Sequence, residues 1–307
     1  MNVREWLLSG DKAVAALVRR HLLNEMVPHD NTGLIEKHLQ RFDPVTARFG
    51  GGVYGPKWVS THYTMVELTA LEVDPNTREY QAGLKTLMTH LWPGRLPRGV
   101  YHIDLCIPGM VLEMLAYAKV DDNIIEEIID YLLDFQMPDG GWNCRIEGEK
   151  KPRVSSVHTT INVLEGLVRI AQGAHTHRID EVNHAINRGI ESLLTRNLIY
   201  KKGTKAPIHH FMTRAHYPPR WKYDYLRGLV LLANHNHPND SRMHDALERL
   251  RAQMIKGRFL RGKTIPGVIA FTLEEGRFGR FNTLRALRVL KRYDETAFHQ
   301  ALTTHAD

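Results

Sequence analysis

The chain has 307 residues, 43% of them hydrophobic and 24% charged, a composition typical of a globular protein and unlike that of a disordered one. Its 41 Lys and Arg residues outnumber the 34 Asp and Glu residues for a net charge of +7, but they form no basic stripe, so we expect no nucleic acid as partner. Two cysteines exclude a disulfide framework and favour a reducing, cytoplasmic location. The sequence predicts neither a signal peptide nor a transmembrane segment.

Helical periodicity runs through most of the chain, because apolar residues recur every three or four positions and strand-type alternation is nearly absent. In chain order, we expect N-terminal helices at 11–24 and 31–41, followed by pairs of helices. The clearest pair covers residues 103–117 and 124–135. Two such helices joined by a few residues form an antiparallel αα-hairpin.

The hairpin repeats along the chain. Five segments come into register when they are aligned on Leu68, Leu112, Leu164, Leu226 and Leu284, which are 44, 52, 62 and 58 residues apart. A small residue follows two positions later in four of them (Ala70, Gly166, Gly228 and Ala286), which suits close helix packing. Repeats of this length predict an all-α (α/α) toroid of five to six hairpins. We expect one domain, 1–307, in which 51–295 form the repeats and 1–50 complete or cap the ring.

The register predicts which side chains face the ring interior. Six positions before the aligned leucine stand His62, Cys106, His158, Arg220 and Phe278. Two positions before it stand Val66, Met110, Asn162, Asp224 and Asn282. These two positions are four residues apart and therefore share a helix face. An inward orientation of this face would give the first helix of each pair a polar lining.

A zinc site is the sharpest prediction from this pattern. Asp104 and Cys106 open one inner helix and His158 opens the next, and a carboxylate, a thiolate and an imidazole are suitable Zn²⁺ ligands. We expect the fourth position to be open, or to be filled by His62 or Cys144. Packing of a buried histidine or thiol is the alternative for each residue.

A basic and aromatic group precedes the fourth inner helix. Pro219 favours an extended entry, which would place Arg220, Trp221 and Lys222 at the cavity rim, where they suit an amphiphilic anion. Asn162, Asn282 and Asp224 would bind substrate, with Asp224 as a second acid or base beside Asp104. Packing and a structural ion pair are the alternatives.

The element Gln-x-x-Asp-Gly-x-Trp at 136–142 resembles the repeat signature of squalene and hopene cyclases and of protein prenyltransferase β subunits. Asp104-x-Cys106, followed by His158-Thr159 in the next repeat, is similar to the zinc site of those β subunits. The resemblance implies a diphosphate-contacting arginine at Arg98, whereas Tyr101 stands where the family has a lysine. The Asp-x-Asp-Asp string of squalene-type cyclases and the Asp-rich strings of prenyl synthases are absent.

The leading hypothesis is a zinc-binding, prenyltransferase- or terpene-cyclase-like enzyme that acts on an isoprenoid or other amphiphilic anionic substrate. A second hypothesis is a carbohydrate-active (α/α)6 barrel with Asp104 and Asp224 as paired carboxylates and tryptophans, such as Trp58, Trp142 and Trp221, as stacking platforms. A third is a non-catalytic binding protein with a fully coordinated structural zinc.

Overall fold

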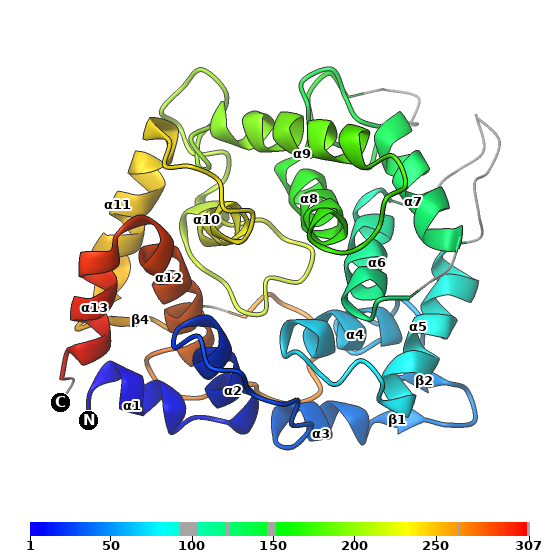
Figure 1. Ribbon diagram of the computed structural model, residues 1–307, viewed down its shortest axis with the longest axis horizontal. Helices are drawn as coiled ribbons and strands as arrows, with labels where there is room; N and C mark the ends of the chain where they lie inside the picture. The colour runs from blue at the N-terminus through cyan, green and yellow to red at the C-terminus, as the bar shows by residue number, and fades with distance from the viewer. Residues whose placement is uncertain (93–103, 121–122, 146–151, 263, 306–307) are drawn as a thin grey trace.

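The computed structural model describes residues 1–92, 104–120, 123–145, 152–262 and 264–305 (Figure 1). Thirteen α-helices lie within these residues and make the chain mostly helical, as the periodicity predicts. The described residues also contain two short antiparallel hairpins and two turns of 3₁₀ helix, which the sequence did not predict. These are β1 (Phe42–Asp43) with β2 (Arg48–Phe49), β3 (Met254–Ile255) with β4 (Arg258–Phe259), η1 (His210–Thr213) and η2 (Ser241–Met243).

Three short helices begin the chain: α1 (Val3–Leu8), α2 (Lys12–His21) and α3 (Leu34–Leu39). Asn2 and Glu5 form a capping box at the start of α1, and the Asp11 side chain caps α2. The helices α2 and α3 fall within the expected ranges 11–24 and 31–41.

Five pairs of helices follow. The first members of the pairs are α4 (Thr61–Ala70), α6 (Cys106–Tyr117), α8 (Val157–Gln172), α10 (Tyr225–Asn234) and α12 (Arg280–Tyr293). The second members are α5 (Arg78–Leu91), α7 (Asn123–Asp134), α9 (Ile179–Leu194), α11 (His244–Gln253) and α13 (Glu295–Thr303). Figure 1 shows the first members on the inside, framed by the second members.

The inner helices bury more of their residues than the outer ones, as α6 and α7 illustrate. Nine of the twelve residues of α6 are buried, because α6 packs against neighbours on several sides. In α7, five of twelve residues are buried and form a single stripe. The five aligned leucines are all buried, each at most 4% exposed, so the register predicted from the sequence marks real core positions.

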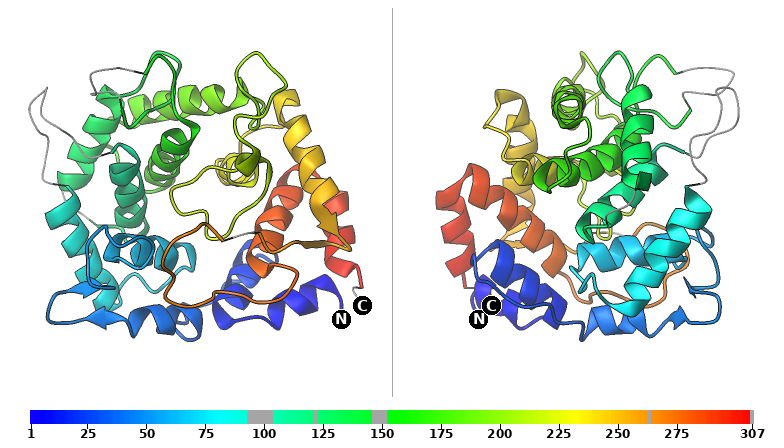
Figure 2. Two further views of the ribbon diagram at one scale, coloured as in Figure 1. Left: turned by 180° about the vertical axis from the view of Figure 1, so that it is seen from behind. Right: turned by 45° about the vertical axis from the view of Figure 1, so that its right-hand side comes forward.

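The two ends of the chain lie side by side (Figures 1 and 2). The helix α1 contacts α13, and α2 contacts α12. The Val3 amide donates to the Thr304 carbonyl at 3.2 Å, and Lys291 Nζ donates to the His21 carbonyl at 3.0 Å. One hydrophobic cluster extends from Val3 to Leu302.

Two long irregular segments interrupt the repeats. The segment 195–224 precedes α10, and the segment 264–279 crosses the face that Figure 2 shows from behind. The helix expected from Arg220 begins instead at Tyr225, because the Lys222 amide donates to the Pro219 carbonyl at 2.9 Å in a turn and Asp224 supplies the N-cap. No helix of the described residues is both long and apolar enough for a membrane crossing.

Candidate functional site

Three potential metal ligands meet at the start of α6. Asp104 precedes the helix, Cys106 is its first residue, and Cys144 comes from the loop between α7 and α8. Their ligand atoms all lie within 4.8 Å of one another. Asp104 is exposed, Cys106 is buried and Cys144 is half-buried, so the cluster opens to solvent on its carboxylate side.

Hydrogen bonds make the two thiols unequal. The Cys106 thiol donates to the Cys144 sulfur, which lowers the pKa of Cys144 and raises that of Cys106. The Thr159 hydroxyl, 3.2 Å from the Cys144 sulfur, lowers the pKa of Cys144 further, whereas burial raises that of Cys106 further. Cys144 is therefore the sulfur that ionises more readily.

This donor set fits zinc. Two sulfurs and a carboxylate oxygen are all ligands that Zn²⁺ accepts, and a fourth position would be left for water or a substrate. Cys144, which the sequence offered only as a possible fourth ligand, is one of the three.

His158 lies outside this cluster. Its Nδ1 accepts a hydrogen bond from the Tyr223 amide at 2.8 Å, so the proton of the neutral ring lies on Nε2. Neither nitrogen then has a free lone pair for a metal. Burial, with Arg227 and Lys222 nearby, lowers the pKa of His158 to about 4. The histidine thus fixes the loop before α10. The structure does not bring His158 to Asp104 and Cys106 as expected, and the three residues that meet there and could hold a metal are Asp104, Cys106 and Cys144.

His62 is also outside the cluster, and it is completely buried. Neither ring nitrogen has a hydrogen-bond partner among the described residues, and burial lowers its pKa to about 3. Its ring packs 5.3 Å from that of Tyr54. Burial raises the pKa of Tyr54 to about 12, and the nearby Cys106 and Asp104 contribute to this shift. Tyr54 therefore borders the cluster of Asp104, Cys106 and Cys144.

An aromatic cage extends from Tyr54 toward the interior. Lys57 Nζ lies 5.4 Å from the ring centre of Tyr54, 5.9 Å from that of Trp58 and 5.6 Å from that of Trp221. Lys222 Nζ also lies 5.6 Å from the Trp221 ring. Cations over aromatic faces are a stable arrangement. Here the cation–aromatic contacts lead from Tyr54, beside the Asp104–Cys106–Cys144 cluster, to Trp58, which lines a cavity.

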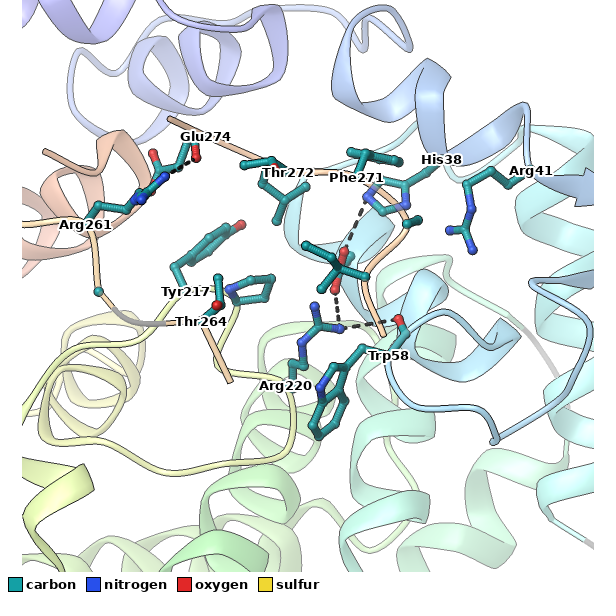
Figure 3. A pocket seen from close by; sticks show the side chains of 16 residues that line it. His38, Arg41, Trp58, Tyr217, Arg220, Arg261, Thr264, Phe271, Thr272 and Glu274 are labelled. Carbon is teal, nitrogen blue, oxygen red and sulfur yellow. Dashed lines mark hydrogen bonds and ion pairs between the residues drawn. The ribbon is translucent and has the colours of Figure 1, made fainter. Parts of the chain in front are cut away.

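This cavity, which we call the Glu67 cavity, has a volume of about 570 Å³ (Figure 3). Its walls come from α3, α4, the loop around Trp58, the segment 217–220 and the segment 261–274. Glu67 Oε1 pairs with Arg220 Nη1 at 2.6 Å, and Glu67 Oε2 lies 3.4 Å from His38 Nε2. The Arg220 guanidinium stacks 4.9 Å from the Trp58 ring centre.

Burial determines the charge states of Glu67 and His38. It raises the pKa of Glu67 to about 7, although Arg220 and Arg41 oppose the shift. It also lowers the pKa of His38 to about 3, so the ring stays neutral. A carboxyl group that titrates near neutrality inside a cavity is typical of sites that move protons.

A second cavity, which we call the central cavity, has a volume of about 430 Å³ and is lined by α2, α4, α6, α8, α10 and α12. Glu67, Tyr217, Pro218 and Arg220 line both cavities. The remaining charged residues of the central cavity are His21, Glu72, Glu113, Glu165, Arg169, Arg227, Arg285 and Arg288.

The predicted rim residues separate in the structure. Arg220 is buried, and its left-handed backbone (φ 55°) aims the guanidinium at Glu67 rather than at the rim. Trp221 and Lys222 are half-buried and are not among the residues that line either cavity. Arg98 and Tyr101 lie outside the described residues.

Asn162, Asn282 and Asp224, predicted to bind substrate, are buried in structural roles. The Asn162 amide donates to the Trp221 carbonyl at 2.8 Å, and Asn282 Oδ1 accepts from Arg285 at 3.0 Å. Asp224 accepts from the Arg227 amide at 2.8 Å and from the His216 amide at 3.0 Å, and it lines neither cavity.

Trp142, predicted as a sugar platform, is likewise buried completely, and its indole donates to the Leu132 carbonyl.

The charged residues of the central cavity were not predicted, because the predictions used the positions two and six residues before each aligned leucine. Glu113, Glu165, Arg227 and Arg285 each directly follow an aligned leucine. A charged residue at one register position in four otherwise apolar segments was the available signal. Glu67 carried only the weak signal of a single acid in an apolar helix.

No protein-family model matches the chain, and no curated protein sequence matches it.

Proposed function

We propose that this protein is a zinc-dependent enzyme built as an α/α toroid, of the prenyltransferase and terpene-cyclase type, that acts on an amphiphilic anionic substrate. The observation that carries the proposal is the meeting of Asp104, Cys106 and Cys144 within 4.8 Å at the start of an inner helix. Supporting the toroid, the inner helices line one cavity and the first and last helices touch.

These three residues would hold the metal. Zinc with an open position supplies a Lewis acid and lowers the pKa of a bound water or thiol. Cys144, whose pKa is lowered by its contact with Cys106, would bind first as thiolate. Asp104, on the solvent side, would leave room for a substrate group to approach.

The interior suits a molecule with an apolar body and an anionic head. Trp58, Tyr217 and Phe271 give the Glu67 cavity aromatic walls, and Arg220 provides a buried cation. A few polar groups in a mostly apolar cavity are typical of small-molecule sites.

The carbohydrate alternative loses two of its proposed residues, because Asp224 lines neither cavity and Trp142 is buried. A different pair of carboxylates could serve a carbohydrate-active enzyme. Glu113 and Glu165 both line the central cavity, and burial together with Glu165 raises the pKa of Glu113. Two coupled carboxyl groups in a cavity are the feature that glycoside hydrolysis requires.

Elemental analysis tests the zinc assignment. Protein purified after zinc-replete expression should contain about one zinc per chain, and Cys144→Ser and Cys106→Ala should each contain less than about 0.3. The matched control is His158→Gln, which should keep its zinc because His158 is outside the cluster. Equal zinc in the wild type and both cysteine variants, or its loss only in His158→Gln, would remove the proposal.

A further inference from the structure

Arg220 is the centre of the Glu67 cavity. Its Nη1 pairs with Glu67 Oε1 at 2.6 Å and donates to the Trp58 carbonyl at 3.3 Å. Its Nε and Nη2 make no hydrogen bond to any described residue, and Arg220 lines the cavity. The guanidinium therefore has donors left for a ligand.

The other groups around Glu67 are already occupied or neutral. Arg41 donates to the Val59 carbonyl and the Thr64 hydroxyl, and the Glu274 carboxylate accepts from the Arg280 amide. Neither nitrogen of the neutral His38 has a hydrogen-bond partner in the described structure. The titratable and charged groups that line the Glu67 cavity from neighbouring elements are His38, Arg41, Tyr217, Arg220, Arg261 and Glu274, and Arg285 lies across the central cavity.

We propose that the Glu67 cavity binds an amphiphilic monocarboxylate through Arg220 when Glu67 is protonated, so that binding to the form with ionised Glu67 takes up one proton from solvent. The carboxylate head would take the free donors of Arg220, and its apolar tail would lie along Trp58, Phe271 and Ile269. This inference deepens the proposed function by naming the substrate class, and it rests on that function only for the amphiphilic anion.

The Glu67–Arg220 pair favours uptake of the proton. The charges of this pair already balance, so a carboxylate bound to Arg220 places a second negative charge beside Glu67, and like charges that share a site repel strongly in a medium of low dielectric, although Arg41 and Arg261 also line the cavity. Protonation leaves Glu67 as a neutral hydrogen-bond donor beside the incoming anion. The raised pKa of Glu67, about 7, means that this proton is available near neutral pH.

The cavity fits such a ligand in size and shape. Its volume of about 570 Å³ lies within the range of roughly 300–1,000 Å³ seen for small-molecule sites. The Phe271 ring packs 4.7 Å from the His38 ring, so an apolar wall stands directly beside the polar group.

Calorimetric titration of the full-length protein with decanoate, between about pH 6 and pH 9 in buffers of different ionisation enthalpy, tests the proposal. In the wild type, Kd should be constant below about pH 7 and rise about tenfold per pH unit above it, with uptake of about one proton per ligand at high pH. In Glu67→Gln, Kd should not depend on pH and should be at least about tenfold lower than in the wild type at pH 8.5. A wild-type Kd that does not change with pH, an unchanged pH dependence in Glu67→Gln, or no decanoate binding at pH 6 would each overturn the proposal.

Two controls locate the proton and separate this inference from the zinc proposal. The variant His38→Gln should keep the pH dependence, because the pKa of His38, about 3, lies below the titrated range; its loss there would assign the proton to His38 and contradict the proposal. The variant Cys144→Ser should lose zinc while proton-linked decanoate binding persists. Lost zinc with intact binding supports both proposals, whereas intact zinc in Cys144→Ser removes only the zinc site.

Discussion

At the scale of single residues, the interior contains buried charged side chains, of which Glu67 and Arg220 form the pair between the two cavities. The Glu67 side chain is 9% exposed and the Arg220 side chain is 6% exposed, so each depends on the other for neutralisation. A buried pair of this kind is weak evidence for stability, because its desolvation offsets most of the attraction. Its placement between two cavities is better explained by a role toward a ligand.

Glu67 should leave a signature in the pH dependence of stability. Its folded pKa of about 7 lies above its ordinary value of 4.5, so the folded protein binds more protons than the unfolded chain between these pH values. Its contribution to the free energy of unfolding is therefore fully present below about pH 4.5 and falls by about 3 kcal/mol as pH rises through about 7.

Urea unfolding at several pH values measures this contribution. The fall between pH 4.5 and 7 should be smaller in Glu67→Gln than in the wild type by about 3 kcal/mol, whatever the absolute stability of the variant. Parallel pH profiles for the two proteins would show that Glu67 does not titrate in this window.

The candidate metal ligands show which part of a site residue spacing can predict. Asp104 and Cys106 were predicted from their spacing, and the structure brings them together. His158, predicted as the third ligand, lies outside this cluster, because it accepts a hydrogen bond from the Tyr223 amide in a loop 65 residues away in sequence. A contact of that range leaves no trace in local periodicity.

At the scale of elements, the aligned leucines predicted the inner helices, but the register lost accuracy at the fourth repeat. Cys106 and His158 lie in the first turns of α6 and α8, as expected. Arg220 lies five residues before α10, since Asp224 begins that helix. Capping by a single side chain thus decided whether a predicted inner residue stands on a helix or in a loop.

Close packing of α6 against α8 depends on glycine. A Cβ at Gly166 would lie 2.5 Å from the Gly109 carbonyl oxygen, a backbone atom that cannot move aside cheaply. We expect Gly166→Ala to lower the free energy of unfolding by about 2–3 kcal/mol.

Denaturant unfolding checks this, with Gly173→Ala as the matched control. The nearest atom to a Cβ at Gly173 is 3.4 Å away, so this change should cost no more than about 0.5 kcal/mol. Similar stabilities for the two variants would mean that the helices are not in this close contact.

At the scale of the whole molecule, the contact between the first and last helices joins residues about 300 positions apart, since Val3 bonds to Thr304. Repeat spacing predicted five or six hairpins and left open whether residues 1–50 complete or cap the ring. The contacts of α1 with α13 and of α2 with α12 join helices from opposite ends of the chain, and local periodicity does not encode contacts of that range. They place α1 and α2 between the last repeat and α3 (Figure 1).

Circular permutation tests this closure. A short linker from His305 to Asn2, with new ends opened between Gly203 and Thr204 in an exposed turn, should leave Tm within about 5 °C of the wild type. A control opened between Leu164 and Glu165, inside α8, should fail to fold. Failure of the first permutant would argue against adjacent ends.

The most direct test of the central claim is zinc K-edge X-ray absorption of the purified wild-type protein. We predict two sulfur ligands at about 2.3 Å and oxygen or nitrogen ligands at about 2.0–2.2 Å, because the proposed site consists of Cys106, Cys144 and Asp104. A spectrum with one sulfur or none would contradict the account.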